Sequence, residues 1–164
     1  MYFLIDGYNL LFSCVTDQKS FQIQREGLLL WMQKQFDNLG LTGIVVFDGG
    51  HQMPYECEIS YQSPLEIAYT PRGQTADSYI VERLSDFSNT GTQTATVVTN
   101  DKGLLGHCRS YSPQTMSSES FVRWLIKKSE KKETVKQKVL KESPFQIDRL
   151  TKIFEARLKT DGSD

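Results

Sequence analysis

Four aspartates of this sequence stand at places where a folded chain could bring them together. Asp6, Asp48 and Asp101 each follow a run of apolar or β-forming residues. Asp77 stands near the start of a segment with helical spacing. In an open parallel sheet, ligands bind outside the carboxyl ends of the strands, so residues distant in sequence can meet there. The pattern predicts a cluster of carboxylates at one edge of a sheet.

Clustered carboxylates raise each other's pKa unless a cation neutralises their charge. Mg²⁺ and Mn²⁺ are the cations that prefer oxygen ligands of this kind. A divalent ion held in this way can activate water for attack on a phosphodiester, and no Ser or His nucleophile is needed. The leading hypothesis from the residues is metal-dependent phosphodiester hydrolysis.

Each of these acids also has an ordinary structural explanation. An Asp-Gly turn would account for Asp6, although Asn9 three residues later could orient the carboxylate or hold a metal-bound water. A negative charge such as Asp77 is favoured in the first turn of any helix, and Asn100 with Asp101 would suit a simple turn. The conjunction of these positions, more than any one of them, favours a site.

The elements that must position these residues alternate along the chain. Strands are expected at residues 2–6, 44–47, 65–69 and 94–99, helices at 21–36, 76–87, 118–141 and 147–158, and a short helix or turn directly after Asp101. Thr75 and Ser117 are suitable N-caps for two of the helices. Alternation of strand and helix implies right-handed crossovers and an α/β fold with a mostly parallel central sheet between helical layers. The segment 65–69 alternates in polarity, as expected of a half-covered edge strand.

Length and composition indicate one ordinary soluble domain. The chain has 164 residues, of which 38% are hydrophobic, enough for a packed core. No apolar stretch approaches the roughly 20 residues of a membrane-spanning helix, and no signal-peptide pattern precedes Asp6. We therefore expect a cytoplasmic protein with no membrane partner. Cys14, Cys57 and Cys108 fit neither a disulfide framework nor a zinc site and are expected to be reduced structural thiols.

Charge is distributed unevenly along the sequence. Residues 1–126 hold eight Lys and Arg against thirteen Asp and Glu, whereas residues 127–164 hold eleven against seven. Residues 1–126 therefore carry a net charge of −5 and residues 127–164 a net charge of +4. This distribution suits a cation-binding domain followed by a tail with affinity for phosphates. The alternative is that the tail is simply a solvated helical face. We expect a domain at 1–126 and a basic helical C-terminal extension at 127–164 that packs on it.

Several motifs together resemble one family. The segments Ile5–Asn9, Val46–Asp48, Tyr69–Asp77 and Val97–Asp101 are similar, in this order, to the signature blocks of NYN-domain, YacP-like proteins, which belong to the PIN-like nuclease class. The resemblance covers roughly residues 1–126. It departs from the family pattern at Asn100, where a Ser often stands, and after Asp48, where two glycines follow.

The resemblance implies a three-layer α/β/α PIN-like fold, one or two divalent ions, Mg²⁺ or Mn²⁺, and endoribonuclease activity. Carried over by position, the metal ligands are Asp6, Asp77 and Asp101, with Asn9 completing the catalytic set. Asp48 and Asn100 are assigned supporting roles. The expected products carry 5′-phosphate and 3′-hydroxyl ends, and the expected partners are RNA, above all mRNA, and the ribosome, with no small-molecule cofactor.

RNA binding needs cations beside such an acidic centre. Arg72 and Lys102, each close in sequence to an expected ligand, are candidates for contacts to phosphates, with surface solvation as the alternative. Tyr8 and Tyr79 could stack on an unpaired base, although aromatic residues at such positions more often belong to the core.

Other function classes compete with the nuclease. The main alternative is a non-catalytic RNA- or ribosome-binding module whose acidic site is too depleted for turnover. Phosphotransfer through an aspartyl phosphate ranks lower, because Tyr8 stands where a second acid is needed. A dinucleotide-binding role ranks last, because no Gly-rich fingerprint follows the first strand.

Overall fold

A computed structural model describes residues 1–14, 21–49, 58–60, 64–91, 94–111 and 113–137. Its strands are β1 (Tyr2–Asp6), β2 (Thr42–Phe47), β3 (Glu58–Ser60), β4 (Leu65–Tyr69), β5 (Ala95–Val98) and β6 (Gln114–Met116). Its helices are α1 (Gly7–Cys14), α2 (Phe21–Leu39), α3 (Ala76–Thr90), α4 (Lys102–Cys108) and α5 (Ser118–Gln137), with a short 3₁₀ turn at Arg109–Tyr111.

The strands form one sheet in the order β3-β4-β2-β1-β5-β6. Five of them are parallel, and β3 alone among the described strands runs antiparallel, beside β4. Strand β1 lies between β2 and β5, with Leu4 in register with Ile44 and Val97. The predicted α/β fold with a mostly parallel sheet is confirmed.

Three elements were not predicted from the sequence. Helix α1 begins directly after β1, where an Asp-Gly turn was expected. Strands β3 and β6 have three residues each, too short to show a period. The prediction of an edge strand at 65–69 is wrong, because β3 pairs with the outer side of β4.

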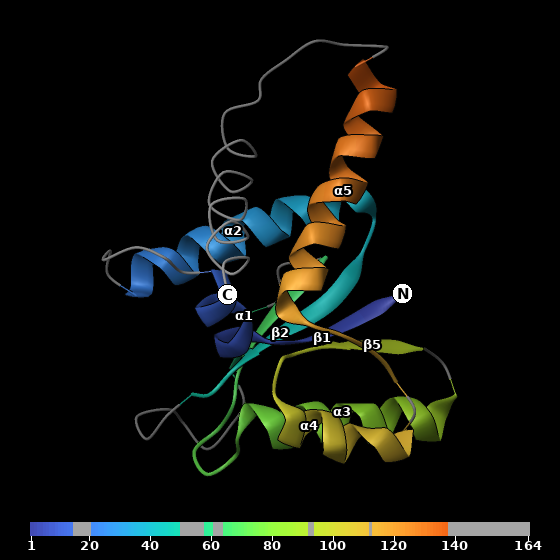
Figure 1. Ribbon diagram of the computed structural model, residues 1–164. Coiled ribbons are helices and arrows are strands. Elements are labelled where there is room, and N and C mark those ends of the chain that lie inside the picture. The colour runs from blue at the N-terminus through green and yellow to red at the C-terminus, as the bar shows by residue number, and fades with distance from the viewer. Residues whose placement is uncertain (15–20, 50–57, 61–63, 92–93, 112, 138–164) are drawn as a thin grey trace, which may run out of the picture.

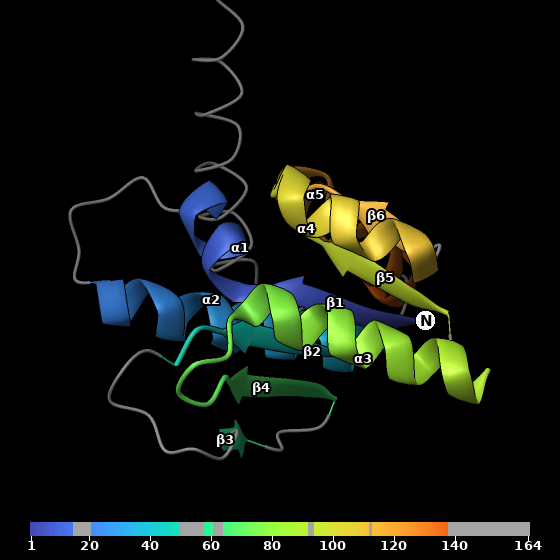
Figure 2. The same ribbon diagram turned by 90° about the horizontal axis from the view of Figure 1, so that it is seen from below.

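The sheet is covered on both faces, as Figures 1 and 2 show. Helices α1, α2 and α5 lie on one face, and α3 and α4 lie on the other. Alternation along β1 serves both layers, because Phe3 and Ile5 belong to the first core whereas Tyr2 and Leu4 belong to the second. Asp6, two residues beyond Leu4, continues the face that α3 and α4 cover.

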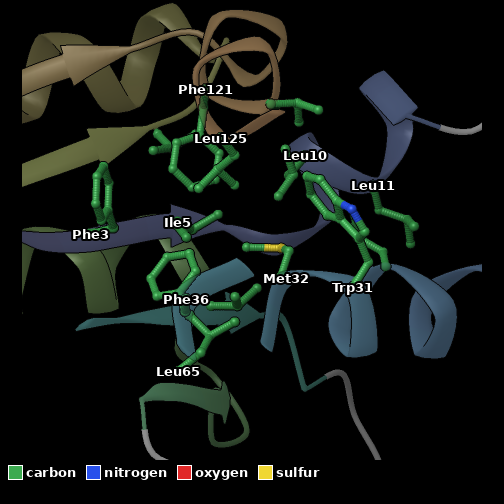
Figure 3. Close-up of a cluster of buried hydrophobic side chains, with 14 of the residues drawn as sticks. Phe3, Ile5, Leu10, Leu11, Trp31, Met32, Phe36, Leu65, Phe121 and Leu125 are labelled. Carbon is green, nitrogen blue, oxygen red and sulfur yellow. The ribbon is translucent and has the colours of Figure 1, made fainter. Parts of the chain in front are cut away.

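The first core fills the space between the sheet and the helices α1, α2 and α5 (Figure 3). Phe3 of β1 meets Phe36 of α2 edge to face at a centroid distance of 5.8 Å, and Phe121 of α5 at 5.2 Å. Aromatic pairs of this geometry add stabilisation beyond the area they bury. Helix α5 is therefore fastened to the centre of the sheet near its first turn.

The second core lies under α3 and α4. Ile80 and Leu84 of α3 and Leu104 and Cys108 of α4 are buried against β1, β2 and β5. Burial raises the pKa of the Cys108 thiol to about 11, with a contribution from the charge of Asp77, so this thiol is neutral at pH 7. Neither Cys14 nor Cys108 is part of a disulfide, and Cys57 lies outside the described residues.

Helix α5 runs without a break past residue 126. The buried hydroxyl of Ser129 donates to Gln35 of α2, and the Lys132 ammonium donates to the carbonyl of Asn38. The division of the chain at residue 126 stays a prediction, and the helix expected at 147–158 lies outside the described residues. In the part of the chain that the structure describes, no helix combines the length and the apolar character needed to cross a membrane.

Candidate functional site

Asp6 is the last residue of the central strand and is only 8% exposed. One carboxylate oxygen, Oδ1, accepts from the backbone N–H of Asn9 at 3.1 Å. The other, Oδ2, accepts from the hydroxyl of Thr99 at 3.1 Å. Because helix α1 starts at Gly7, its first turn delivers the Asn9 N–H to the carboxylate.

Thr99 joins two of the acids. Its hydroxyl oxygen accepts from the backbone N–H of Asp101 at 3.0 Å while its proton goes to Asp6. The residue is buried at the end of β5, next to β1 in the sheet. The parallel pairing of these two strands therefore fixes the Asp101 backbone relative to the Asp6 carboxylate.

Asp77 is presented by the first turn of α3. Thr75 is the N-cap, and its hydroxyl accepts from the backbone N–H of Ser78 at 3.1 Å in a capping box. Oδ1 of Asp48, just past β2, accepts from the backbone N–H of Ala76 at 2.7 Å. Asp48 thus ties the end of β2 to the beginning of α3 and sets where Asp77 emerges.

Asp101 caps α4. Its Oδ1 accepts from the backbone N–H groups of Gly103 at 2.6 Å and Leu104 at 3.0 Å. Asp101 therefore has a structural role as a helix cap, in addition to any role in a site. Among the described residues, the hydrogen bonds to Asp101 and to Asp48 reach Oδ1 of each carboxylate.

The four acids act on one another electrostatically. Burial raises the pKa of Asp6, and the charges of Asp77 and Asp48 raise it further, while the hydrogen bonds from Asn9 and Thr99 oppose the shift. Burial also raises the pKa of Asp77, followed by the charges of Asp101 and Asp48, against a lowering by His107. The structure thus brings the acidic positions predicted from the sequence into one neighbourhood.

Whether these residues fit a cation depends on the coordination it needs. Among the described residues, no group of three Asp, Glu, His or Cys side chains is arranged to enclose a metal ion. Mg²⁺ does not require such a cage, because it keeps several waters and uses one or two carboxylates together with substrate phosphates. Burial first, and then the charges of the neighbouring acids, raise the pKa of Asp6 and of Asp77, and a bound divalent ion would favour the charged form of both carboxylates.

A polar network connects this centre to α5. The side-chain oxygen of Asn9 accepts from the Asn100 backbone N–H at 2.8 Å and from the Ser118 hydroxyl at 3.1 Å. Asn100 in turn accepts from the Ser118 backbone N–H at 2.9 Å and donates its amide to both oxygens of Glu119, at 2.9 and 3.1 Å. Asn9 and Asn100 therefore hold the start of α5 against the acidic centre.

The network contains functional candidates that the sequence analysis missed. Glu119 adds a fifth carboxylate at the rim, and Thr99 and Ser118 are buried polar side chains. The sequence did contain a signal for Glu119. It is an acid in the first turn of a helix that Ser117 caps, and that helix begins just beyond a strand, as the helix of Asp101 does. Nothing in the local sequence marks Ser118 as a partner of Asn9.

The remaining sequence candidates lie around the centre. Lys102 is exposed directly after Asp101, and Arg72 is exposed in the connection between β4 and α3. Their predicted contacts to phosphates stay predictions. Tyr79 is buried under α3 and has no free face for a base, whereas Tyr8 is half-buried beside the site.

The chain is similar to two crystal structures of Rae1 (YacP) from Bacillus subtilis. One, of a tryptophan-to-leucine mutant, has 22% sequence identity and a TM-score of 0.66, covering 98% of this chain and 97% of that chain. The other has 23% identity and a TM-score of 0.64, covering 98% and 91%. At this identity the likeness establishes the fold. No curated protein matches the sequence.

The family model of the YacP-like NYN domain matches residues 3–160, which is nearly the whole chain. The resemblance inferred from the sequence motifs is therefore confirmed. With its acids gathered at the carboxyl edge of a parallel sheet, this chain belongs to the YacP-like NYN family, whose members are generally nucleases that act on RNA.

Proposed function

We propose that this chain is an endoribonuclease that depends on Mg²⁺ or Mn²⁺, with Asp6, Asp77 and Asp101 as the metal-holding carboxylates. The observation that supports the proposal is the mutual electrostatic effect of the acids at one sheet edge. Family membership adds RNA as the substrate class. We further propose that the RNA is mRNA, acted on freely or on the ribosome.

The chain's own residues would act by position and charge. Thr99 and the Asn9 N–H favour the charged form of Asp6 and fix its two oxygens before a substrate arrives. A divalent ion, when bound, would supply Lewis-acid activation of the scissile phosphodiester and of the attacking water. Hydrolysis would leave a 5′-phosphate and a 3′-hydroxyl. Asn9 would serve as a positioning residue for Asp6 and for the start of α5.

Cations on α5 support binding of an RNA backbone. Arg123, Lys127 and Lys131 are exposed and spaced four residues apart, so they form one stripe along a helix that starts at the acidic centre. A rise of about 1.5 Å per residue places neighbouring members of the stripe about 6 Å apart along the axis. The stripe can therefore offset the repulsion between RNA and the acids, together with Arg72 and Lys102.

The test is cleavage of single-stranded and structured RNAs with Mg²⁺, Mn²⁺ or EDTA. We expect cleavage only with a divalent ion. Asp77→Asn and Asp6→Asn should each lower the rate by about a hundredfold or more, because several kcal/mol of Lewis-acid stabilisation depends on these ligands and each 1.36 kcal/mol is tenfold. Asp86→Asn, an exposed acid on the same helix as Asp77, is the control and should cleave normally.

A non-catalytic RNA- or ribosome-binding module is the second candidate. It is favoured by the finding that no three acidic side chains among the described residues are arranged to enclose an ion. Such a module would bind RNA in EDTA as well as in Mg²⁺ and would show no cleavage for Asp77→Asn to abolish. Cleavage that persists in EDTA would contradict the metal-dependent mechanism.

A further inference from the structure

Three aromatic rings form a partly exposed cluster at the junction of α1 and α2. Tyr8 stacks nearly parallel on Phe12, at 6.2 Å and 24°, and on Phe21, at 5.7 Å and 25°. Phe12 and Phe21 contact each other at 5.7 Å. Phe12 is 64% exposed and Phe21 is 41% exposed. Adjacent exposed phenylalanines leave apolar surface in water that no core in the described residues covers.

This aromatic cluster adjoins the acidic centre. Tyr8 comes two residues after Asp6. Its ring meets the ring of Phe47 edge to face, at a centroid distance of 5.1 Å, and Phe47 is the residue before Asp48. The contact is close because Gly7 lies directly against the Phe47 ring, where an added Cβ would come within 2.6 Å. The cluster is therefore joined, through Tyr8 and Phe47, to the segments that carry Asp6 and Asp48, and it extends from there to Phe12 on α1 and Phe21 on α2.

The guanidinium of Arg25 lies next to this aromatic cluster, over the rings that continue it. Phe47 stacks on Tyr69 at 5.6 Å, and the guanidinium of Arg25 lies over both rings, at 5.9 and 5.5 Å. Its Nε is buried and has no hydrogen-bond partner among the described residues. An aromatic surface flanked by a guanidinium suits a ligand with a planar ring and a negative charge, which describes a nucleotide.

We propose that Tyr8, Phe12 and Phe21 form a stacking surface for an unpaired base of the RNA substrate, beside the phosphodiester that is cleaved. The proposal rests on the proposed function and deepens it, because it assigns single-stranded RNA as the substrate class. Bases within a duplex are stacked on their neighbours and cannot offer a free face to a protein ring. The Arg25 guanidinium supplies charge complementarity to the adjacent phosphate.

The experiment measures RNA affinity in Mg²⁺ with the full chain carrying Asp77→Asn, so that bound RNA stays intact. A labelled single-stranded oligonucleotide is compared with its fully paired duplex by fluorescence anisotropy. Phe12→Leu keeps apolar character and loses the ring, and we expect about tenfold weaker single-strand binding, from the 1–3 kcal/mol of a base–aromatic stack, with duplex binding unchanged. Phe12→Trp should retain the affinity.

Leu30→Ala is the matched control, since Leu30 is 72% exposed on α2 and has no part in the cluster. It should bind like the parent. In Phe12→Trp, single-stranded RNA should also quench the new tryptophan fluorescence beyond the change seen in the parent, whose own tryptophans are the buried Trp31 and the half-buried Trp124. That spectroscopic change reports stacking directly and does not depend on cleavage.

Equal single-strand affinity for Phe12→Leu and the parent would overturn the stacking surface and leave the nuclease proposal standing. Loss of single-strand and duplex binding to the same degree would also overturn it. Absence of additional quenching in Phe12→Trp would overturn the stacking surface as well. A parent that binds no RNA at all would overturn the stacking surface and the proposed function together.

Discussion

The hydroxyl of Thr99 has a disproportionate role for one buried atom. It donates to Asp6 and accepts from the Asp101 N–H, so it satisfies a carboxylate and a helix cap at once. Buried polar groups are costly when left without a partner, and here two would lose theirs together. The precision of the acidic centre therefore depends on a residue with no chemistry of its own.

Thr99→Val should destabilise the fold by about 1–3 kcal/mol, because Val keeps the shape and removes both hydrogen bonds. The pKa of Asp6 should rise further, since the Thr99 hydrogen bond lowers it. Urea denaturation measures the first effect. Thr99→Ser retains the hydroxyl and should stay close to the natural chain. A Val variant as stable as the Ser variant would contradict this account.

The raised pKa of Asp6 has a defined consequence for stability in EDTA. Between its ordinary value of 3.8 and the raised value, the folded state holds the proton more firmly than the unfolded state. The contribution of Asp6 to the free energy of unfolding is therefore lost as the pH rises through this window. Asp6→Asn removes the titration, so the stability of the variant relative to the natural chain should increase with pH.

Denaturation curves for the two proteins at several values between pH 4 and 7 would measure this gap, which is the free energy of unfolding of Asp6→Asn minus that of the natural chain. A gap that stays constant, or that becomes smaller as the pH rises, would show that the folded state does not raise the pKa of Asp6. Added Mg²⁺ should reduce the gap at pH 7, because a bound cation stabilises the charged carboxylate of the natural chain.

At the scale of elements, the starts of four helices lie at the acidic centre, and one of them is α1, whose first turn donates the Asn9 N–H to Asp6. Helix α3 carries Asp77 in its first turn, α4 is capped by Asp101, and α5 begins at Ser118 beside Asn9. The positive ends of helix dipoles favour negative charge, so they help to hold acids that repel one another. They also make the same region suitable for phosphate.

Neutralising the α5 stripe tests how the helix contributes to RNA binding. Arg123→Ala, Lys127→Ala and Lys131→Ala combined should weaken binding of single-stranded RNA. The plot of log affinity against log salt should become shallower by about 0.7 for each phosphate that the helix no longer neutralises. Affinity titrations at 50–200 mM salt measure the slope. Lys34→Ala, an exposed cation on α2, should leave it unchanged. An unaltered slope in the triple variant would exclude the stripe as a phosphate-binding surface.

At the scale of the whole molecule, the first core, between the sheet and the helices α1, α2 and α5, supports both the sheet and the acidic centre. Phe121 is completely buried between α5 and the sheet, four residues after the Ser117 cap. Loosening α5 would therefore disturb Ser118 and its hydrogen bond to Asn9. Packing far from the acids and geometry at the acids are linked through this single helix.

Phe121→Ala should cost about 3–5 kcal/mol, as expected for a buried phenylalanine. This is a large part of the roughly 5–15 kcal/mol that stabilises an ordinary domain. Phe12→Ala, the same substitution at an exposed position, should cost no more than about 1 kcal/mol. Thermal or urea unfolding of the two variants measures the difference. Similar losses at both sites would mean that α5 is not fastened to the sheet through Phe121.

The amino-acid pattern alone was enough for the fold class, the family and most long elements. Buried strands such as β1 and β2 are short apolar runs, α2 and α3 show helical spacing, and Thr75 is a recognisable cap of α3, so their signals are local. The acids could be found for the same reason, since Asp6, Asp48 and Asp101 stand at or just after the ends of such strands and Asp77 stands in the first turn of such a helix. Helix α1 and the short strands β3 and β6 escaped, because they lack a period long enough to read.

What the folded chain alone decided is how distant side chains meet. The order β3-β4-β2-β1-β5-β6 places the ends of β1 and β5 side by side, and so brings Thr99 to Asp6 across 93 positions of sequence. It also puts Ser118 and Glu119 beside Asn9 and Asn100, and Phe12 and Phe21 beside Tyr8. No local pattern specifies these pairings, because they follow from the packing of both helical layers on one sheet.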